Sequence, residues 1–75
     1  MKDLLYMIVS SIVDYPDQIE IVESDRDGVV AFELHVADSD MGRIIGKNGK
    51  TARAIRDLVK AAAIKEHKKV IVDII

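Results

Sequence analysis

The spacing of hydrophobic residues predicts a helix at the start of the chain. Apolar side chains recur every three or four residues, which places them on one helical face: Leu5, Ile8, Val9 and Ile12. The predicted helix covers residues 3–14, with Asp3 as its N-cap. Pro16 stops it, because the residue before a proline avoids the helical region of backbone space.

Two runs in which apolar and polar residues alternate predict a β-hairpin. The first predicted strand covers residues 18–24 and the second covers residues 29–37. The turn between them, Asp25–Gly28, ends in a glycine that suits a positive φ. So short a connection requires antiparallel strands. In the second strand, alternate residues are expected to face the core: Val30, Phe32, Leu34 and Val36.

The second half of the chain predicts two helices and a final strand. Asp38 and Asp40 offer N-cap side chains for a short helix over residues 41–45. The loop Gly46–Gly49 interrupts the pattern, and a longer helix follows over residues 50–67. A β-branched run then predicts a strand over 70–75.

The predicted order, α-β-β-α-α-β, describes one α+β domain over residues 1–75, with helices packed on one face of a three-stranded sheet. The chain has no cysteine and only two histidines, so we expect no disulfide, metal or cofactor. No apolar stretch approaches the roughly 20 residues that span a bilayer, and no cleavage pattern of a signal peptide is present. We therefore expect a cytoplasmic protein without a membrane partner.

Charge is distributed unevenly along the chain. Residues 1–41 carry ten acidic and two basic side chains, whereas residues 42–75 carry three acidic and nine basic ones. The net charge of -2 conceals this difference. A protein that is acidic overall and gathers its basic residues in one half is expected to present a face that binds a polyanion.

The densest group of basic residues surrounds a glycine-containing loop. Six basic residues and one acidic residue, Asp57, lie between Gly42 and Lys60; the basic ones are Arg43, Lys47, Lys50, Arg53, Arg56 and Lys60 itself. Gly46 and Gly49 lack side chains, so a sugar–phosphate backbone can approach the main chain there. The start of the following helix attracts anions. The alternatives are a simple helix C-cap followed by a turn, and a solvated helix face.

This stretch resembles the KH domain, whose signature is an aliphatic pair followed by G-x-x-G between two helices. Residues 44–49, Ile-Ile-Gly-Lys-Asn-Gly, match that signature. The element order is similar to the type II arrangement, and the whole chain is similar to small single-KH bacterial proteins of the KhpA type. One departure is Ala52, where many KH domains have isoleucine. A smaller residue there predicts a shallower nucleotide groove.

The resemblance implies a non-catalytic protein that binds single-stranded RNA, and no pair of candidate catalytic side chains argues for an enzyme. It implies an RNA chaperone or post-transcriptional regulator linked to cell elongation and cell-wall homeostasis. The RNA-binding residues would be Arg43, Ile44, Ile45, Gly46, Lys47, Asn48, Gly49, Lys50 and Arg53. A KH-fold interaction module with little RNA binding of its own is the alternative.

A further apolar stripe on the long predicted helix points to self-association. Its members lie to one side of the stripe that we assign to the sheet: Ala54, Leu58, Ala61 and Ile64. They either widen the core-facing stripe or form a dimer interface, in which the small alanines let a second helix approach closely. The resemblance implies a homodimer or a pair with a larger KH-containing protein of the KhpB/Jag type.

Overall fold

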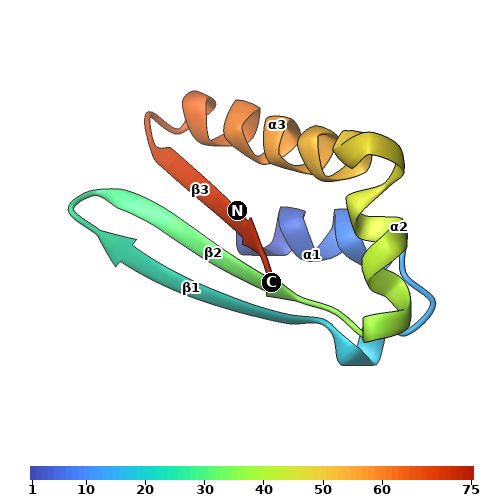
Figure 1. The fold of residues 1–75 in the computed structure, drawn as a ribbon. Coiled ribbons are helices and arrows are strands. Elements are labelled where there is room, and N and C mark those ends of the chain that lie inside the picture. The colour runs from blue at the N-terminus through green and yellow to red at the C-terminus, as the bar shows by residue number, and fades with distance from the viewer.

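The computed structural model describes all 75 residues, and its elements follow the predicted order (Figure 1). The helices are α1 (Lys2–Ser10), α2 (Met41–Ile45) and α3 (Lys50–Lys65). The strands are β1 (Glu20–Arg26), β2 (Val29–His35) and β3 (Lys69–Ile74). Three short 3-10 turns complete the chain: Pro16–Gln18, Asp38–Asp40 and Lys47–Gly49. The prediction of an α+β domain with a three-stranded sheet is confirmed, and no helix has the length and apolar character needed to cross a bilayer.

The sheet has the strand order β1-β2-β3 and is mixed. Strand β1 pairs with β2 in antiparallel fashion, as the short turn requires, whereas β3 runs parallel to β2. A parallel neighbour needs a long crossover connection, and here α2, the loop and α3 provide it. The side chains of β2 alternate accordingly: Phe32 and Leu34 are buried under the helices, while Glu33 lies on the opposite face.

One hydrophobic core joins all three helices to the central part of the sheet. Its fully buried members come from α1, α2, α3, β2 and β3: Leu5, Val9, Ile44, Ile55, Val59, Phe32, Leu34 and Val72. Val30 and Val36 pack against this core and are partly exposed. All four core-facing residues predicted in the second strand therefore contribute to the core.

The first helix is shorter than predicted and has a different start. Met1 occupies the N-cap position and Asp3 lies within the first turn, so Asp3 is not the cap. The helix ends at Ser10, six residues before Pro16. The hydroxyl groups of Ser10 and Ser11 donate hydrogen bonds to the carbonyls of Met7 and Ile8, at 3.0 and 2.6 Å. Serine side chains compete in this way with backbone amides for the helical carbonyls. The helix therefore ends before Pro16 can stop it.

The hairpin turn is tighter than predicted. Strand β1 is displaced two residues along the chain, because Pro16–Gln18 form a 3-10 turn and the strand continues through Asp25 to Arg26. Only Asp27 and Gly28 remain in the turn, with φ values of 54° and 82°. Two consecutive positive φ angles fit a two-residue hairpin whose twist matches that of the strands.

The ends of the later elements also differ slightly from the prediction. Strand β2 ends at His35 rather than at residue 37, and α3 ends at Lys65 rather than at residue 67. His67 has a positive φ of 57°, which no α-helix accommodates. Strand β3 covers Lys69–Ile74 instead of residues 70–75. The short helix α2 has the predicted bounds.

The side chain of Asp40 holds the segment after α1 instead of capping α2. It is only 1% exposed, and its two carboxylate oxygens accept hydrogen bonds from the backbone amides of Asp14 and Tyr15, at 3.0 and 3.1 Å. No side-chain hydrogen bond caps α2, and Asp38 is exposed. Asp40 occupies the N-cap position of α2 as predicted, but the prediction that either aspartate caps the helix with its side chain is wrong. The carboxylate instead satisfies amides from the distant segment that follows α1.

We expect Asp40→Ala to lower the free energy of unfolding by about 2 kcal/mol or more, because it removes two hydrogen bonds from partly buried amides to a carboxylate, and a hydrogen bond to a charged group contributes about 1.5–3 kcal/mol. Asp38→Ala is the matched control, since that neighbouring aspartate is exposed. Urea unfolding followed by circular dichroism measures both variants. Equal effects for the two substitutions would contradict the structural role of Asp40.

Candidate nucleic-acid interface

The G-x-x-G loop connects α2 to α3 through three residues with positive φ. Gly46 ends α2 with φ 73° and ψ 176°, Asn48 has φ 57° and ψ 28°, and Gly49 has φ 75° and ψ 12°. The amide of Gly46 donates to the carbonyl of Gly42 at 2.9 Å, and the amide of Gly49 donates to the carbonyl of Gly46 at 3.2 Å. Asparagine tolerates the left-handed region better than most residues, which explains its place between the glycines.

Gly46 is also required by close packing against α3. A Cβ atom at this position would lie 2.6 Å from the Cβ of Thr51 and 2.9 Å from its backbone nitrogen, and it would collide with the threonine hydroxyl. A Cβ at Gly49 would meet no atom within 4 Å. The first glycine therefore lets the loop fold back on the first turn of α3, while the second leaves open space beside the main chain.

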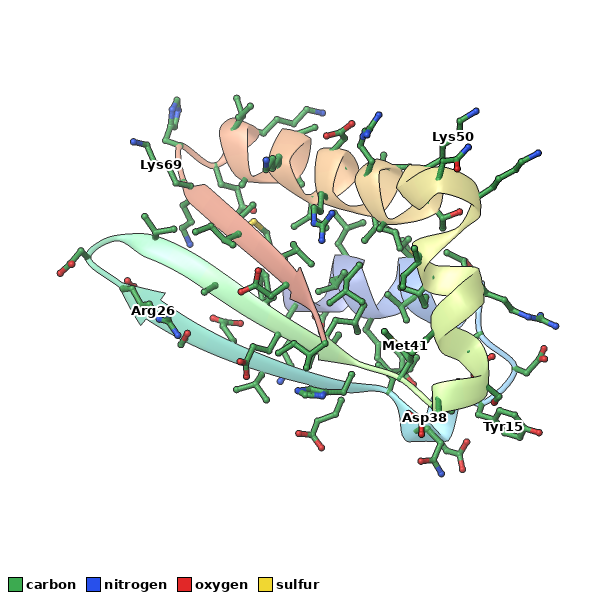
Figure 2. All side chains as sticks on the ribbon, viewed as in Figure 1. Tyr15, Arg26, Asp38, Met41, Lys50 and Lys69 are labelled. Atoms are coloured by element: carbon green, nitrogen blue, oxygen red, sulfur yellow. The ribbon has the colours of Figure 1, made fainter.

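Three cations near the loop form no salt bridge. Lys47, Lys50 and Arg53 are exposed and take part in no ion pair. Figure 2 shows the side chain of Lys50 extending into solvent at the start of α3. No side chain caps the N-terminus of α3, so its positive dipole end adds to these charges. An anion bound at the loop could therefore contact both the exposed cationic side chains and the accessible backbone.

Arg43 differs from the other predicted contact residues because it is already paired. Its Nη1 donates to Oδ1 of Asp14 at 3.1 Å, and its Nη2 lies 3.0 Å from Oδ2. Both side chains are exposed, so a ligand phosphate can compete with the carboxylate for this guanidinium. Arg56, on α3, is also engaged: its Nε donates to the backbone carbonyl of Val72 in β3 at 3.1 Å.

The aliphatic pair before the loop is divided between the core and the surface. Ile44 is fully buried in the core, whereas Ile45 is 43% exposed. Ile44, one of the predicted RNA-binding residues, therefore offers a ligand no exposed side-chain surface. Successive residues of a short helix point about 100° apart, which separates the two neighbours. Ile45 remains the candidate for contact with a base.

The predicted self-association stripe is exposed on α3. Its four members lie outside the core, with Leu58 55% and Ile64 72% exposed. The residues that α3 buries are instead Ala52, Ile55, Val59 and Ala63. The alternative of a wider core-facing stripe is therefore wrong. The helix keeps an apolar face that this chain does not cover.

Comparisons with known proteins agree along the whole chain. The family model "KhpA/KhpB, KH domain" matches residues 2–74. The RNA-binding protein KhpA of Caldanaerobacter subterraneus subsp. tengcongensis is 51% identical and that of Clostridium acetobutylicum is 49% identical, both over 75 residues and 100% of each chain. The RNA-binding protein KhpA of Bacillus subtilis is 44% identical over 70 residues, 93% of this chain and 86% of that one. The chain therefore belongs to the KhpA/KhpB family of KH domains, which is a non-enzymatic family.

Proposed function

We propose that this chain binds single-stranded RNA through the Gly46–Gly49 loop. The observation that carries the proposal is the loop itself: two glycines with positive φ at the N-terminus of α3, beside exposed cations that form no salt bridge. G-x-x-G loops of KH domains clamp about four nucleotides of a single strand by the backbone.

Each part of the loop has a separate role in this proposal. Phosphates approach the main chain where Gly49 leaves open space, and Lys47 and Lys50 supply the opposite charge. Arg53 continues the positive surface one turn further along α3. Ile45 offers an exposed aliphatic surface to a base. Asn48 presents a side-chain donor at the tip of the loop.

The relatives support this proposal through their names, since each is called an RNA-binding protein. The finer role that we propose is that of an RNA chaperone or post-transcriptional regulator in the cytoplasm. The resemblance to KhpA-type proteins supports its link to cell elongation and cell-wall homeostasis.

Lys47→Asp combined with Asn48→Asp should abolish RNA binding and leave the fold intact. Both side chains are exposed and aspartate tolerates the left-handed backbone at position 48, so the stability cost should be within about 1 kcal/mol. Two carboxylates would repel the phosphates at the loop. Fluorescence anisotropy with a short single-stranded RNA measures binding, and circular dichroism monitors the fold.

The matched control places the same charge changes outside the loop, as Lys2→Asp with Gln18→Asp at two exposed positions. It should bind RNA within a few-fold of the wild type. If the loop variant also binds within a few-fold while remaining folded, the loop is not the RNA site.

We also propose that the chain pairs through the exposed stripe of α3, with a second copy or with a larger KH-containing protein of the KhpB/Jag type. Leu58 lies at the centre of the stripe, flanked by two small exposed alanines, Ala54 and Ala61. These alanines let a second helix approach closely, so leucine and isoleucine side chains from both partners lose contact with water. The loop lies at the end of the same helix and stays free.

Leu58→Lys should convert the dimer into a folded monomer, because a buried, unpaired ammonium group opposes association. Sedimentation equilibrium measures the molecular mass. Val22→Lys is the control, since Val22 is 42% exposed and lies on β1. A monomeric wild type that binds no KH partner, or a Leu58→Lys protein that remains dimeric, would show that the stripe is not the interface.

A further inference from the structure

A hollow of about 370 Å³ lies at the end of α3 that is remote from the G-x-x-G loop. The last turns of α3, the start of β3 and the start of β2 enclose it, and its lining residues are Val29, Lys60, Ala63, Ile64, Lys68, Lys69, Val70 and Ile71. Figure 2 shows Lys50, beside the loop, and Lys69, at the hollow, at opposite ends of α3. The hollow is therefore separate from the proposed RNA site.

The hollow lies at the start of β3, which is an edge strand. This strand pairs only with β2, so its other edge has no neighbouring strand. The lining includes Val70, whose side chain is buried under the helices, together with Lys69 and Ile71, which lie on the opposite face of the strand. Three consecutive residues of this edge strand therefore line the hollow, and an extended segment can lie alongside their free backbone edge.

Arg56 limits how far along the strand such a segment can extend. Its guanidinium donates to the carbonyl of Val72, at 3.1 Å, and so occupies the edge beyond the hollow. The accessible part of the edge covers only the first residues of β3. A short segment fits this length, whereas a long added strand would have to displace Arg56.

The chemistry of the hollow is an aliphatic floor with a cationic rim. Five of the eight lining residues are apolar, and the other three are lysines. Ile64 and Ile71, on opposite sides, are 72% and 50% exposed, so a ligand would cover apolar surface that faces water here. No acidic side chain lines the hollow. The complementary ligand is anionic and carries an aliphatic group.

RNA fits this chemistry less well than a peptide does. Single-stranded RNA is held by stacking of bases on aromatic rings or by phosphate contacts near exposed backbone. The three aromatic residues of the chain, Tyr6, Tyr15 and Phe32, lie outside the hollow. The lysines would serve a phosphate, but the lining contains no glycine at which a phosphate could approach exposed backbone as it can beside Gly49. A peptide with an aliphatic side chain between carboxylates matches both parts of the lining, because the aliphatic group contacts the isoleucines and the carboxylates pair with the lysines.

We propose that this hollow binds a short extended segment of a partner protein, in which acidic residues flank an aliphatic one. The aliphatic side chain enters between Ile64 and Ile71, and the carboxylates pair with Lys60, Lys68 and Lys69. The segment runs along the free edge of β3 up to Arg56. The binding surface is independent of the G-x-x-G loop and shares Ile64 with the α3 stripe, so the peptide and a partner at the stripe compete for that side chain.

The test uses a fluorescein-labelled peptide, Glu-Glu-Ile-Glu-Glu, with the full-length chain. Methyl NMR locates the peptide, and we expect the largest shifts at Ala63, Ile64, Val70 and Ile71. Lys69→Glu should weaken binding by about tenfold or more, since reversing a charge at the rim replaces attraction by repulsion. Lys2→Glu makes the same charge change on α1 and should bind as the wild type does.

Two further arms separate the contributions of charge and aliphatic contact. Ile71→Lys should also weaken binding, with Val22→Lys as the control on the outer strand β1. Both positions are exposed, so both variants should fold. A peptide with serine in place of isoleucine should bind more weakly by a similar factor.

Three results would overturn the proposal. The first is that the peptide shifts methyl groups elsewhere, and the second is that the serine peptide binds as well as the isoleucine peptide. The third is that a short oligouridine RNA shifts the same four residues and displaces the peptide, which would assign the hollow to RNA. Because the Lys47→Asp, Asn48→Asp variant should retain peptide binding, failure of the RNA proposal and failure of this one are distinguishable.

Discussion

Replacing Gly46 with alanine should lower the free energy of unfolding by about 3 kcal/mol or more, the largest effect of any loop substitution. Two separate costs add up here. Its φ of 73° and ψ of 176° fall in a region that is essentially restricted to glycine, at a cost of about 1–3 kcal/mol for other residues. The new Cβ would also overlap Thr51, and such crowding costs about 1–3 kcal/mol more.

Gly49→Ala is the matched control for this prediction. Its φ is also positive, but its ψ of 12° places it in the left-handed helical region, and a Cβ there meets no atom. The cost should be about 1–2 kcal/mol. Urea unfolding of the two variants provides the comparison. If Gly49→Ala proves equal to or worse than Gly46→Ala, the contact with Thr51 does not constrain the loop.

Phe32→Ala should lower the melting temperature of the protein sharply. Phe32 is 1% exposed and is the largest side chain in the core, and such truncations cost about 3–5 kcal/mol. A domain of this length has a total stability of roughly 4–11 kcal/mol, so the loss removes a large share of it. Thermal unfolding by circular dichroism measures the effect.

Val22→Ala serves as the comparison on the neighbouring strand β1, because Val22 is largely exposed. Its melting temperature should stay within a few degrees of the wild type, as expected for about 0.5 kcal/mol at the surface. A Phe32→Ala protein that melts close to the wild type would mean that the core does not depend on the centre of β2.

The elements that were predicted well are those whose ends depend on local chemistry. Helix α2 has the predicted bounds because Gly46 adopts a backbone conformation that ends a helix whatever surrounds it. The end of α1 differs from the prediction because the hydroxyls of Ser10 and Ser11 compete with the helical backbone and because a distant residue holds the segment that follows. Asp40 draws the amides of Asp14 and Tyr15 away from helical geometry, and nothing in the first sixteen residues signals that bond.

The loop and its exposed cations could be identified from spacing and charge alone, since both are local properties of residues 43–53. The burial of Ile44 could not, because adjacent isoleucines look equivalent until packing separates them. The contact between Gly46 and Thr51 and the ion pair between Arg43 and Asp14 depend on three-dimensional proximity. The exposed stripe around Leu58 could be predicted from a helical wheel, because the 3.6-residue period of a helix determines which residues share a face.

The parallel pairing of β2 and β3 has a consequence for how the chain folds. Val29 pairs with Lys69, so 40 residues must be closed into a loop before this half of the sheet forms. Such non-local contacts slow folding compared with a helical bundle of equal length. Until β3 docks, the buried side chains of β2 face water along an open strand edge, which favours aggregation. Because α3 and β3 share one core, a chain that lacks β3 also lacks part of the surface that packs against the helix carrying the G-x-x-G loop.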